Sequence, residues 1–159
     1  MVPIVEPDVS NQGNHDLETC QKVTETVLAA VYKALNDNHV FLEGTLLKPN
    51  FVTPGLQGPK ATVQEVGDAT ITAFRRNVPM AVPGIFFLSG GLGEELSSLY
   101  LNAVNKSKGN STWRLSYSYG RALTGSAWKA YGKDKDVKGC QTEFLKKAQD
   151  NFKASHGNL

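Results

Sequence analysis

Hydrophobic and polar positions along the chain follow two periods, which predict strands and helices in turn. Short apolar or alternating stretches predict strands at residues 2–5, 40–48, 85–88 and 113–118. After the first stretch, apolar positions recur at helical spacing, at Leu17, Cys20, Val23, Val27 and Val31. The beginning of the chain therefore predicts one strand followed by one helix.

The same order repeats along the rest of the chain. Helices are predicted after the later strands, at about residues 62–76, 94–103 and 120–131. The first of these opens with a capping-box pattern from Thr62 to Glu65. A terminal helix follows, with one apolar face made of Val137, Cys140, Phe144, Ala148 and Phe152.

This alternation predicts an α/β fold with about four parallel strands, each followed by a helix, and an extra C-terminal helix. Strand–helix–strand units cross over right-handedly into a parallel sheet, and strands buried on both faces are apolar runs of this kind. Residues 1–159 suffice for a single domain with its own core. Trp113 and Trp128 are expected in that core.

Charge and hydropathy disfavour two classes of partner. The chain has 17 Lys and Arg against 15 Asp and Glu, and no dense basic cluster that would indicate binding to nucleic acid or to an anionic membrane. Its apolar stretches fall short of the ~20 residues that span a bilayer, and its N-terminus lacks a signal-peptide pattern. We therefore expect a cytoplasmic protein with neither nucleic-acid nor membrane partners.

Cysteine and histidine spacing gives no sign of a metal site. Cys20 and Cys140 are far apart in sequence, which favours two buried or half-buried thiols in a reducing compartment, with a disulfide or redox role as the alternative. His15, His39 and His156 show no metal-ligand spacing. The expectation is a protein that binds no metal.

Candidate chemistry collects where the predicted strands end, because the carboxyl ends of parallel strands share one edge of the sheet. Lys48 follows Leu46 on one strand face, so its amine would emerge from apolar packing. Burial of this kind lowers the pKa of a lysine, as Schiff-base formation requires. A lysine that extends into solvent from a strand end is the alternative interpretation.

Two carboxylates follow the first predicted strand. Glu6 and Asp8 can divide proton transfer between a tuned group and an ionised one. Solvated carboxylates at the end of a strand are an equally good interpretation.

Two turns carry the features of an anion site. Gly90 and Gly91 allow close approach of the backbone to an anion, and Gly120 precedes Arg121, whose guanidinium can bind phosphate bidentately near a helix start. Ser89-Gly90-Gly91 alone is also typical of an ordinary turn. Two such turns after adjacent strands favour a phosphate site.

Four segments strongly resemble class I fructose-bisphosphate aldolases: residues 2–7, 42–50, 87–91 and 118–123. The run Glu-Gly-Thr-Leu-Leu-Lys-Pro-Asn is highly specific, and residues 20–55 are most similar to cytosolic plant-type enzymes. The resemblance covers nearly the whole chain. It implies the second half of a (β/α)8 TIM barrel, strands five to eight.

The resemblance also implies roles for the candidate residues. Lys48 would form the Schiff base with the ketose or dihydroxyacetone phosphate, and Glu6 would act as general acid and base. Asp8 stands where the family usually has Glu, as a possible supporting carboxylate. No cofactor or metal is implied, since the imine is the electron sink. The positions that match the family's phosphate-binding residues are Ser89, Gly90, Gly91, Ser118, Gly120 and Arg121.

The implied activity is that of a lyase of glycolysis and gluconeogenesis, which reversibly cleaves fructose 1,6-bisphosphate to dihydroxyacetone phosphate and glyceraldehyde 3-phosphate. In the family, the first half of the barrel supplies an aspartate used in carbon–carbon bond cleavage. Four strands alone leave two open edges and an apolar inner face with Leu46, so we expect a homo-oligomer, association with aldolase subunits, or a marginally stable monomer. The alternative is a truncated, inactive paralogue that binds sugar phosphates or associates with full-length subunits.

Overall fold

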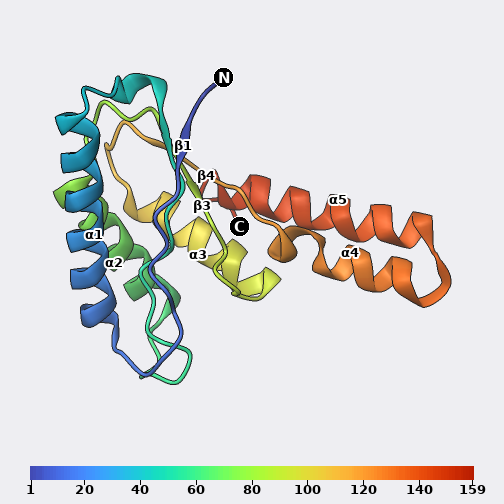
Figure 1. The fold of residues 1–159 in the computed structure, drawn as a ribbon. Coiled ribbons are helices and arrows are strands. Elements are labelled where there is room, and N and C mark those ends of the chain that lie inside the picture. Colours follow the sequence, from blue (N-terminus) through green and yellow to red (C-terminus); the bar gives the residue numbers. More distant parts are fainter.

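The structure is a computed structural model that describes the backbone of residues 1–159 and all side chains except those at positions 133 and 134. Four parallel strands form one sheet in the order β1-β2-β3-β4. Figure 1 shows the chain coloured along its length, with the last two helices extending away from the rest. The predicted α/β fold with an extra C-terminal helix is confirmed. The elements in chain order are β1 (Ile4–Val5), α1 (Leu17–Asp37), the 3-10 helix η1 (Leu42–Gly44), β2 (Leu46–Leu47), α2 (Val63–Asn77), β3 (Gly84–Phe87), α3 (Glu94–Ser107), β4 (Arg114–Tyr117), α4 (Arg121–Asp134) and α5 (Val137–Ala154).

The second strand is much shorter than the alternating pattern over residues 40–48 predicts. η1 occupies the middle of that stretch, and only Leu46–Leu47 pairs as a strand. The Leu42 carbonyl accepts hydrogen bonds from both the backbone N–H of Thr45, at 3.0 Å, and its hydroxyl, at 2.8 Å. Local bonds of this kind compete with the strand ladder, so the prediction was wrong for its first part.

Backbone pairing continues beyond the strands at their carboxyl ends. The N–H of Lys48 donates to the Val5 carbonyl at 2.7 Å, and that of Ser118 donates to the Phe87 carbonyl at 2.9 Å. The strand ends are therefore held side by side at one edge of the sheet.

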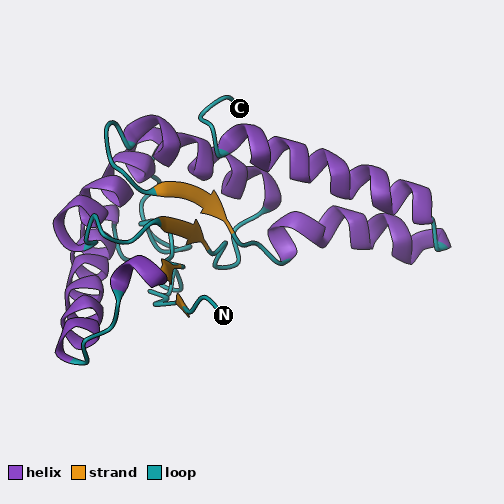
Figure 2. Cartoon of the chain, turned by 90° about the horizontal axis from the view of Figure 1, so that it is seen from above, coloured by secondary structure: helices purple, strands orange, loops and turns teal.

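The two faces of the sheet differ in what covers them. Leu47 and Ile85 are fully buried beneath the helices, whereas Ile4, on the opposite face, is 53% exposed. Figure 2 shows α1, α2 and α3 around one side of the sheet, with α4 and α5 extending away from it as a hairpin. The sequence predicts an exposed apolar face of the sheet that includes Leu46. In the structure this face is only partly exposed, because the half-buried side chains of Leu46 and Phe86 lie over Gly84.

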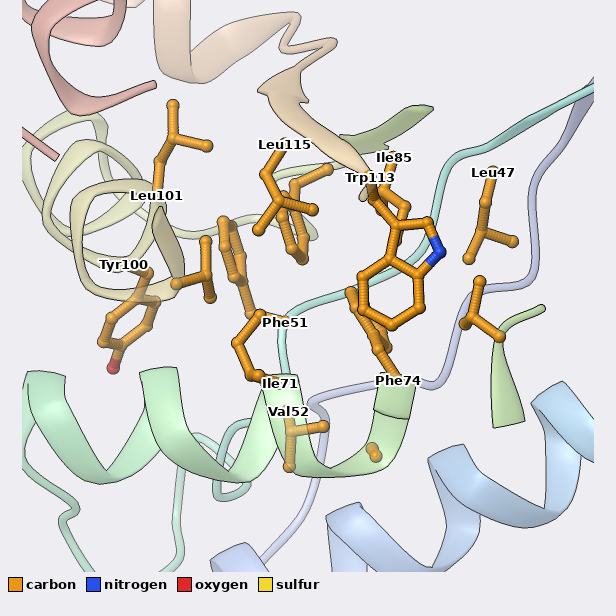
Figure 3. Close-up of a cluster of buried hydrophobic side chains, with 14 of the residues drawn as sticks. Leu47, Phe51, Val52, Ile71, Phe74, Ile85, Tyr100, Leu101, Trp113 and Leu115 are labelled. Carbon is orange, nitrogen blue, oxygen red and sulfur yellow. The ribbon is translucent and has the colours of Figure 1, made fainter. Parts of the chain in front are cut away.

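An aromatic cluster forms the centre of the core. The Phe87 ring stacks on Phe51 with centroids 4.2 Å apart, and lies 5.6 Å from the Phe74 ring. Trp113 is 1% exposed, as predicted, and its indole N–H donates to the Pro79 carbonyl. Figure 3 shows Phe51, Phe74 and Trp113 among the side chains that fill this core.

The α1 helix is confirmed, but its buried face is rotated relative to the predicted one, and Cys20 is common to both. Its buried residues are shifted by one position relative to Val23, Val27 and Val31, and Val23 is 44% exposed. Packing against α2 and the loop after β2 selects this face, which carries Cys20, Thr24, Leu28 and Tyr32. Burial raises the pKa of the Cys20 thiol. Both cysteines are free, Cys20 buried and Cys140 half-buried, as predicted.

The α4–α5 hairpin corrects two further expectations. Trp128 is 66% exposed rather than part of the core, and Phe152, on the predicted apolar face of α5, is 64% exposed. The hairpin helices pack chiefly on each other, and α5 meets α3 through Asn151, which accepts a hydrogen bond from Ser98 at 3.0 Å. In the part of the chain that the structure describes, no helix has the length and apolar character needed to cross a membrane.

Candidate functional site

A pocket of about 530 Å³ lies at the carboxyl ends of the strands. Every site residue predicted from the sequence lines it, which follows from the parallel strand order. These residues are Glu6, Asp8, Lys48, Ser89, Gly90, Gly91, Ser118, Gly120 and Arg121. Their chemical roles remain predictions.

Lys48 and Glu6 form an ion pair in this pocket. The Nζ atom of Lys48 lies 3.0 Å from Oε1 of Glu6, and the two side chains are 21% and 50% exposed. In the register of β1 and β2, Ile4 pairs with Leu46 and Val5 with Leu47. One step further along both strands, Glu6 and Lys48 come side by side on the same face.

The β3–α3 loop has a conformation that requires glycine. Gly90 has φ +55° and Gly91 has φ +81°, in the left-handed region that L side chains rarely adopt. The Leu92 N–H donates to the Ser89 carbonyl at 2.9 Å and closes the turn. A Cβ atom at Gly91 would meet no other atom within 4 Å, so the backbone here is open to a ligand.

The β4–α4 loop carries the second set of candidate anion ligands. Gly120 is the N-cap of α4, and Arg121 is its first, exposed residue. Between Ser118 and Gly120 lies Tyr119, whose hydroxyl donates to the Ser97 carbonyl at 3.0 Å. Burial, with a smaller contribution from Tyr117, raises the pKa of the Tyr119 phenol. Tyr119 thus anchors the loop as a neutral hydrogen-bond donor.

Glu94 ties α4 to the start of α3 next to this pocket. Its carboxylate accepts hydrogen bonds from the backbone N–H of Ser126, at 2.6 Å, and from the Ser126 hydroxyl, at 2.8 Å. Lys147 on α5 lies 4.0 Å from the same carboxylate. A smaller pocket of about 310 Å³ lies between α3 and α4 and shares Arg121 with the first. Glu94 therefore holds the helix that carries Arg121.

Asn50 is a pocket residue that the sequence did not indicate, beyond ending a predicted strand. It is 6% exposed, its Oδ1 accepts from the Val9 N–H at 3.1 Å, and its Nδ2 donates to the Phe51 carbonyl. Asn50 thereby fixes the loop after β1 next to Lys48. Its position in the loop at the carboxyl end of β2, two residues after Lys48, is the signal that would have marked it.

Metal-ligand chemistry is not gathered at this edge of the sheet. Within the described residues, His, Cys, Asp and Glu side chains form no group of three or more that could hold a metal ion. The pocket instead combines one lysine, carboxylates, glycine-rich backbone and an arginine, which suits a phosphorylated carbonyl compound.

Comparison with known proteins identifies the family of this chain. A family model described as fructose-bisphosphate aldolase class-I matches residues 1–159. Fructose-bisphosphate aldolase B of Gallus gallus is 58% identical over 159 residues, 99% of this chain and 44% of that protein. Fructose-bisphosphate aldolase 5, cytosolic, of Arabidopsis thaliana is 55% identical over 158 residues, with the same coverage of both chains.

A solved structure matches over the whole chain. Fructose-bisphosphate aldolase from Plasmodium falciparum, in complex with TRAP and a small molecule inhibitor, is 45% identical with a TM-score of 0.96. The match covers 100% of this chain and 46% of that chain, so the chain spans slightly less than half the length of its relatives. The fold, the site and these matches together show that the chain belongs to the class I fructose-bisphosphate aldolase family.

Proposed function

We propose that this chain carries the Schiff-base part of an aldolase site and acts in the reversible cleavage of fructose 1,6-bisphosphate to dihydroxyacetone phosphate and glyceraldehyde 3-phosphate. The observation that carries the proposal is the 3.0 Å pair of Lys48 and Glu6 in a pocket that also contains two candidate phosphate loops. Family membership adds weight to it. The cytosolic Arabidopsis thaliana relative supports a cytoplasmic location for this chain as well.

Imine formation is the step that the residues of this chain can perform. The Lys48 ammonium gives up a proton, for which the Glu6 carboxylate is an acceptor at 3.0 Å. The free amine then attacks the substrate carbonyl carbon, and one proton moves from the nitrogen to the oxygen to give a carbinolamine. The resulting hydroxyl leaves as water after protonation by Glu6, and a carbon–nitrogen double bond replaces the carbonyl.

The imine then draws electrons from the substrate. When the carbon–carbon bond breaks, its electron pair moves toward the protonated imine nitrogen and leaves an enamine, while the other fragment departs as an aldehyde. The resemblance assigns the proton acceptor for the aldehyde hydroxyl to an aspartate of the first barrel half. Cleavage by this chain therefore calls for that half in addition to Lys48.

Phosphate binding positions the carbonyl over Lys48. In our proposal the backbone of Gly90 and Gly91, the Ser89 and Ser118 hydroxyls and the Arg121 guanidinium take the phosphate oxygens. All of these groups line the pocket that contains Lys48. Held in this way, the substrate reacts as part of a complex rather than in a bimolecular collision.

The test is borohydride trapping. The chain is incubated with dihydroxyacetone phosphate, reduced, and mapped by peptide mass for an adduct on Lys48. We expect the adduct in the unchanged chain and in Lys60→Arg, an exposed lysine outside this pocket, and no adduct in Lys48→Arg. Absence of the Lys48 adduct, while a full-length aldolase traps normally, would exclude this function for the chain.

A second candidate is a chain that binds sugar phosphates or associates with aldolase subunits without turning over substrate. Its support is the sheet, in which β1 and β4 each have one neighbouring strand, and the 53% exposure of Ile4 on the inner face. We propose that this face is covered by another copy or by an aldolase subunit. Sedimentation as a homo-oligomer, or co-purification with a full-length aldolase, would support this interface. A monomer that does not bind added aldolase would contradict it.

A further inference from the structure

Asn11 joins three loops at the rim of the pocket. Its side-chain Nδ2 donates to the Gly90 carbonyl in the β3–α3 loop at 3.0 Å. Its own backbone carbonyl accepts from the Leu56 N–H in the loop after β2 at 2.9 Å. Asn11 itself follows β1, so a single residue connects the loops of three neighbouring strands above their carboxyl ends.

A second contact matches this orientation of the Asn11 amide. Its Oδ1 accepts a hydrogen bond from Nε2 of Gln12 at 3.3 Å, which leaves the amino group toward Gly90. The Asn11 segment is also held from behind, since the Gln57 N–H donates to the Gly13 carbonyl and the Gly55 N–H to the His15 carbonyl, each at 2.9 Å. The Asn11 N–H donor therefore lies on a loop that backbone hydrogen bonds hold in place.

The group that Asn11 holds belongs to the candidate phosphate loop. Gly90 and Gly91 both have positive φ, and glycine visits many other conformations at little cost. Because the peptide unit is planar and trans, the N–H of Gly91 points opposite to the Gly90 carbonyl. A hydrogen bond that fixes the carbonyl thus also fixes the direction of that N–H.

We propose that Asn11 is a positioning residue for phosphate: through the Gly90 carbonyl it holds the Ser89-Gly90-Gly91 backbone in the conformation that receives the phosphate of the substrate. This inference rests on the proposed function for its substrate, but its core, phosphate affinity, can be measured without any reaction. Asn11 does not touch the reacting atoms in this scheme. It acts by lowering the conformational cost of binding.

Three variants test the inference. Asn11→Ala removes the side chain, and Asn11→Leu keeps its approximate size while removing the N–H donor and adding no charge. Asn14→Ala is the matched control, because Asn14 is an exposed residue of the same loop with no side-chain hydrogen bond to another described residue.

Binding of inorganic phosphate is measured by calorimetry. Borohydride trapping at Lys48 is measured with dihydroxyacetone phosphate and with dihydroxyacetone, which lacks the phosphate. Thermal melting identifies any variant that fails to fold, in which case the other Asn11 variant is used.

We expect both Asn11 variants to weaken phosphate binding about threefold to tenfold, as loss of one hydrogen bond does. The half-saturating concentration of dihydroxyacetone phosphate in trapping should rise by the same factor, while trapping of dihydroxyacetone stays unchanged. Asn14→Ala should match the original chain in all three measurements. General damage to the fold would weaken the binding or trapping of all three ligands, whereas loss of the Asn11 contact should affect only the ligands that carry phosphate.

The inference is overturned if the original chain and the Asn11 variants bind phosphate equally, or if neither binds it. It is also overturned if the Asn11 variants lower the trapping of dihydroxyacetone phosphate and of dihydroxyacetone by the same factor. Failure of the proposed function looks different. In that case phosphate binding still depends on Asn11, but no adduct forms on Lys48 with either compound.

Discussion

Glu6 and Lys48 lie side by side because β1 and β2 pair in parallel with Ile4 opposite Leu46, which brings the residues two positions further along each strand into ion-pair distance at 3.0 Å. Side chains two apart on a strand share a face. The pair is thus a direct consequence of sheet register, and a slip by one residue would send Glu6 to the other face.

Glu6→Gln tests this relationship. The amide keeps the shape of the side chain but neither accepts the proton of Lys48 nor protonates the leaving hydroxyl. We expect imine trapping at Lys48 to slow by about 10²-fold to 10⁴-fold, the usual contribution of general acid–base catalysis. Rates of borohydride-trapped adduct formation give the measurement. Asp8→Asn, at a carboxylate of the same pocket without an ion pair to Lys48, should slow trapping less. Equal rates for Glu6→Gln and the original chain would contradict the assigned role.

Glu94→Ala should loosen the helix that carries Arg121. The change removes the acceptor of both Ser126 hydrogen bonds, at 2.6 and 2.8 Å, from a site where the Glu94 side chain is 21% exposed. Hydrogen bonds to a charged group contribute about 1.5–3 kcal/mol, so we expect a loss of stability in this range. Hydrogen exchange of α4 amides should accelerate selectively. Glu95→Ala, at an exposed neighbouring residue, is the control. Equal effects of the two changes on stability and on α4 exchange would contradict the assigned role of Glu94.

Phe87→Ala should be among the most damaging changes in the core. Phe87 is fully buried and stacked on Phe51 with an interplanar angle of 3°. Removing a buried phenyl ring costs about 3–5 kcal/mol, from lost burial and from the cavity left behind. Phe152→Ala, at a ring that is 64% exposed, should change the unfolding free energy by less than about 0.5 kcal/mol. Denaturant unfolding of both variants compares them, and similar midpoints would contradict the core assignment.

Glu65 makes stability depend on acid pH. Its hydrogen bonds from the Thr62 backbone N–H, and then from the Thr62 hydroxyl, hold the pKa of its carboxyl below the ordinary value of 4.5. Because the folded-state pKa is lowered, this contribution is fully present above the unfolded value and is lost as the pH falls through the folded one. Glu65→Gln should therefore show a smaller drop in melting temperature between neutral and strongly acidic solution. A drop as large as that of the original chain would mean that the capping box does not contribute.

The spacing of residues along the sequence predicted the helices and strands of this protein more reliably than it predicted which side chains they bury. The capping box from Thr62 to Glu65 is present at the start of α2, since it involves residues only three positions apart. The same local analysis failed for residues 40–45, where the 3-10 helix η1 and irregular backbone replace the predicted strand. It also failed for Trp128, because the hairpin of α4 and α5 leaves that ring outside the core.

The order of strands and helices, and the gathering of Lys48 and the anion-binding candidates at one edge of the sheet, could be predicted from the sequence. Periodicity is a property of neighbouring residues, and parallel strands must end at a common edge. Two features became visible only in the folded chain: α1 buries Thr24 rather than Val23, and Asn11 reaches Gly90 across 79 positions of the chain. Such choices depend on which surfaces meet once the elements pack, and that information is not local.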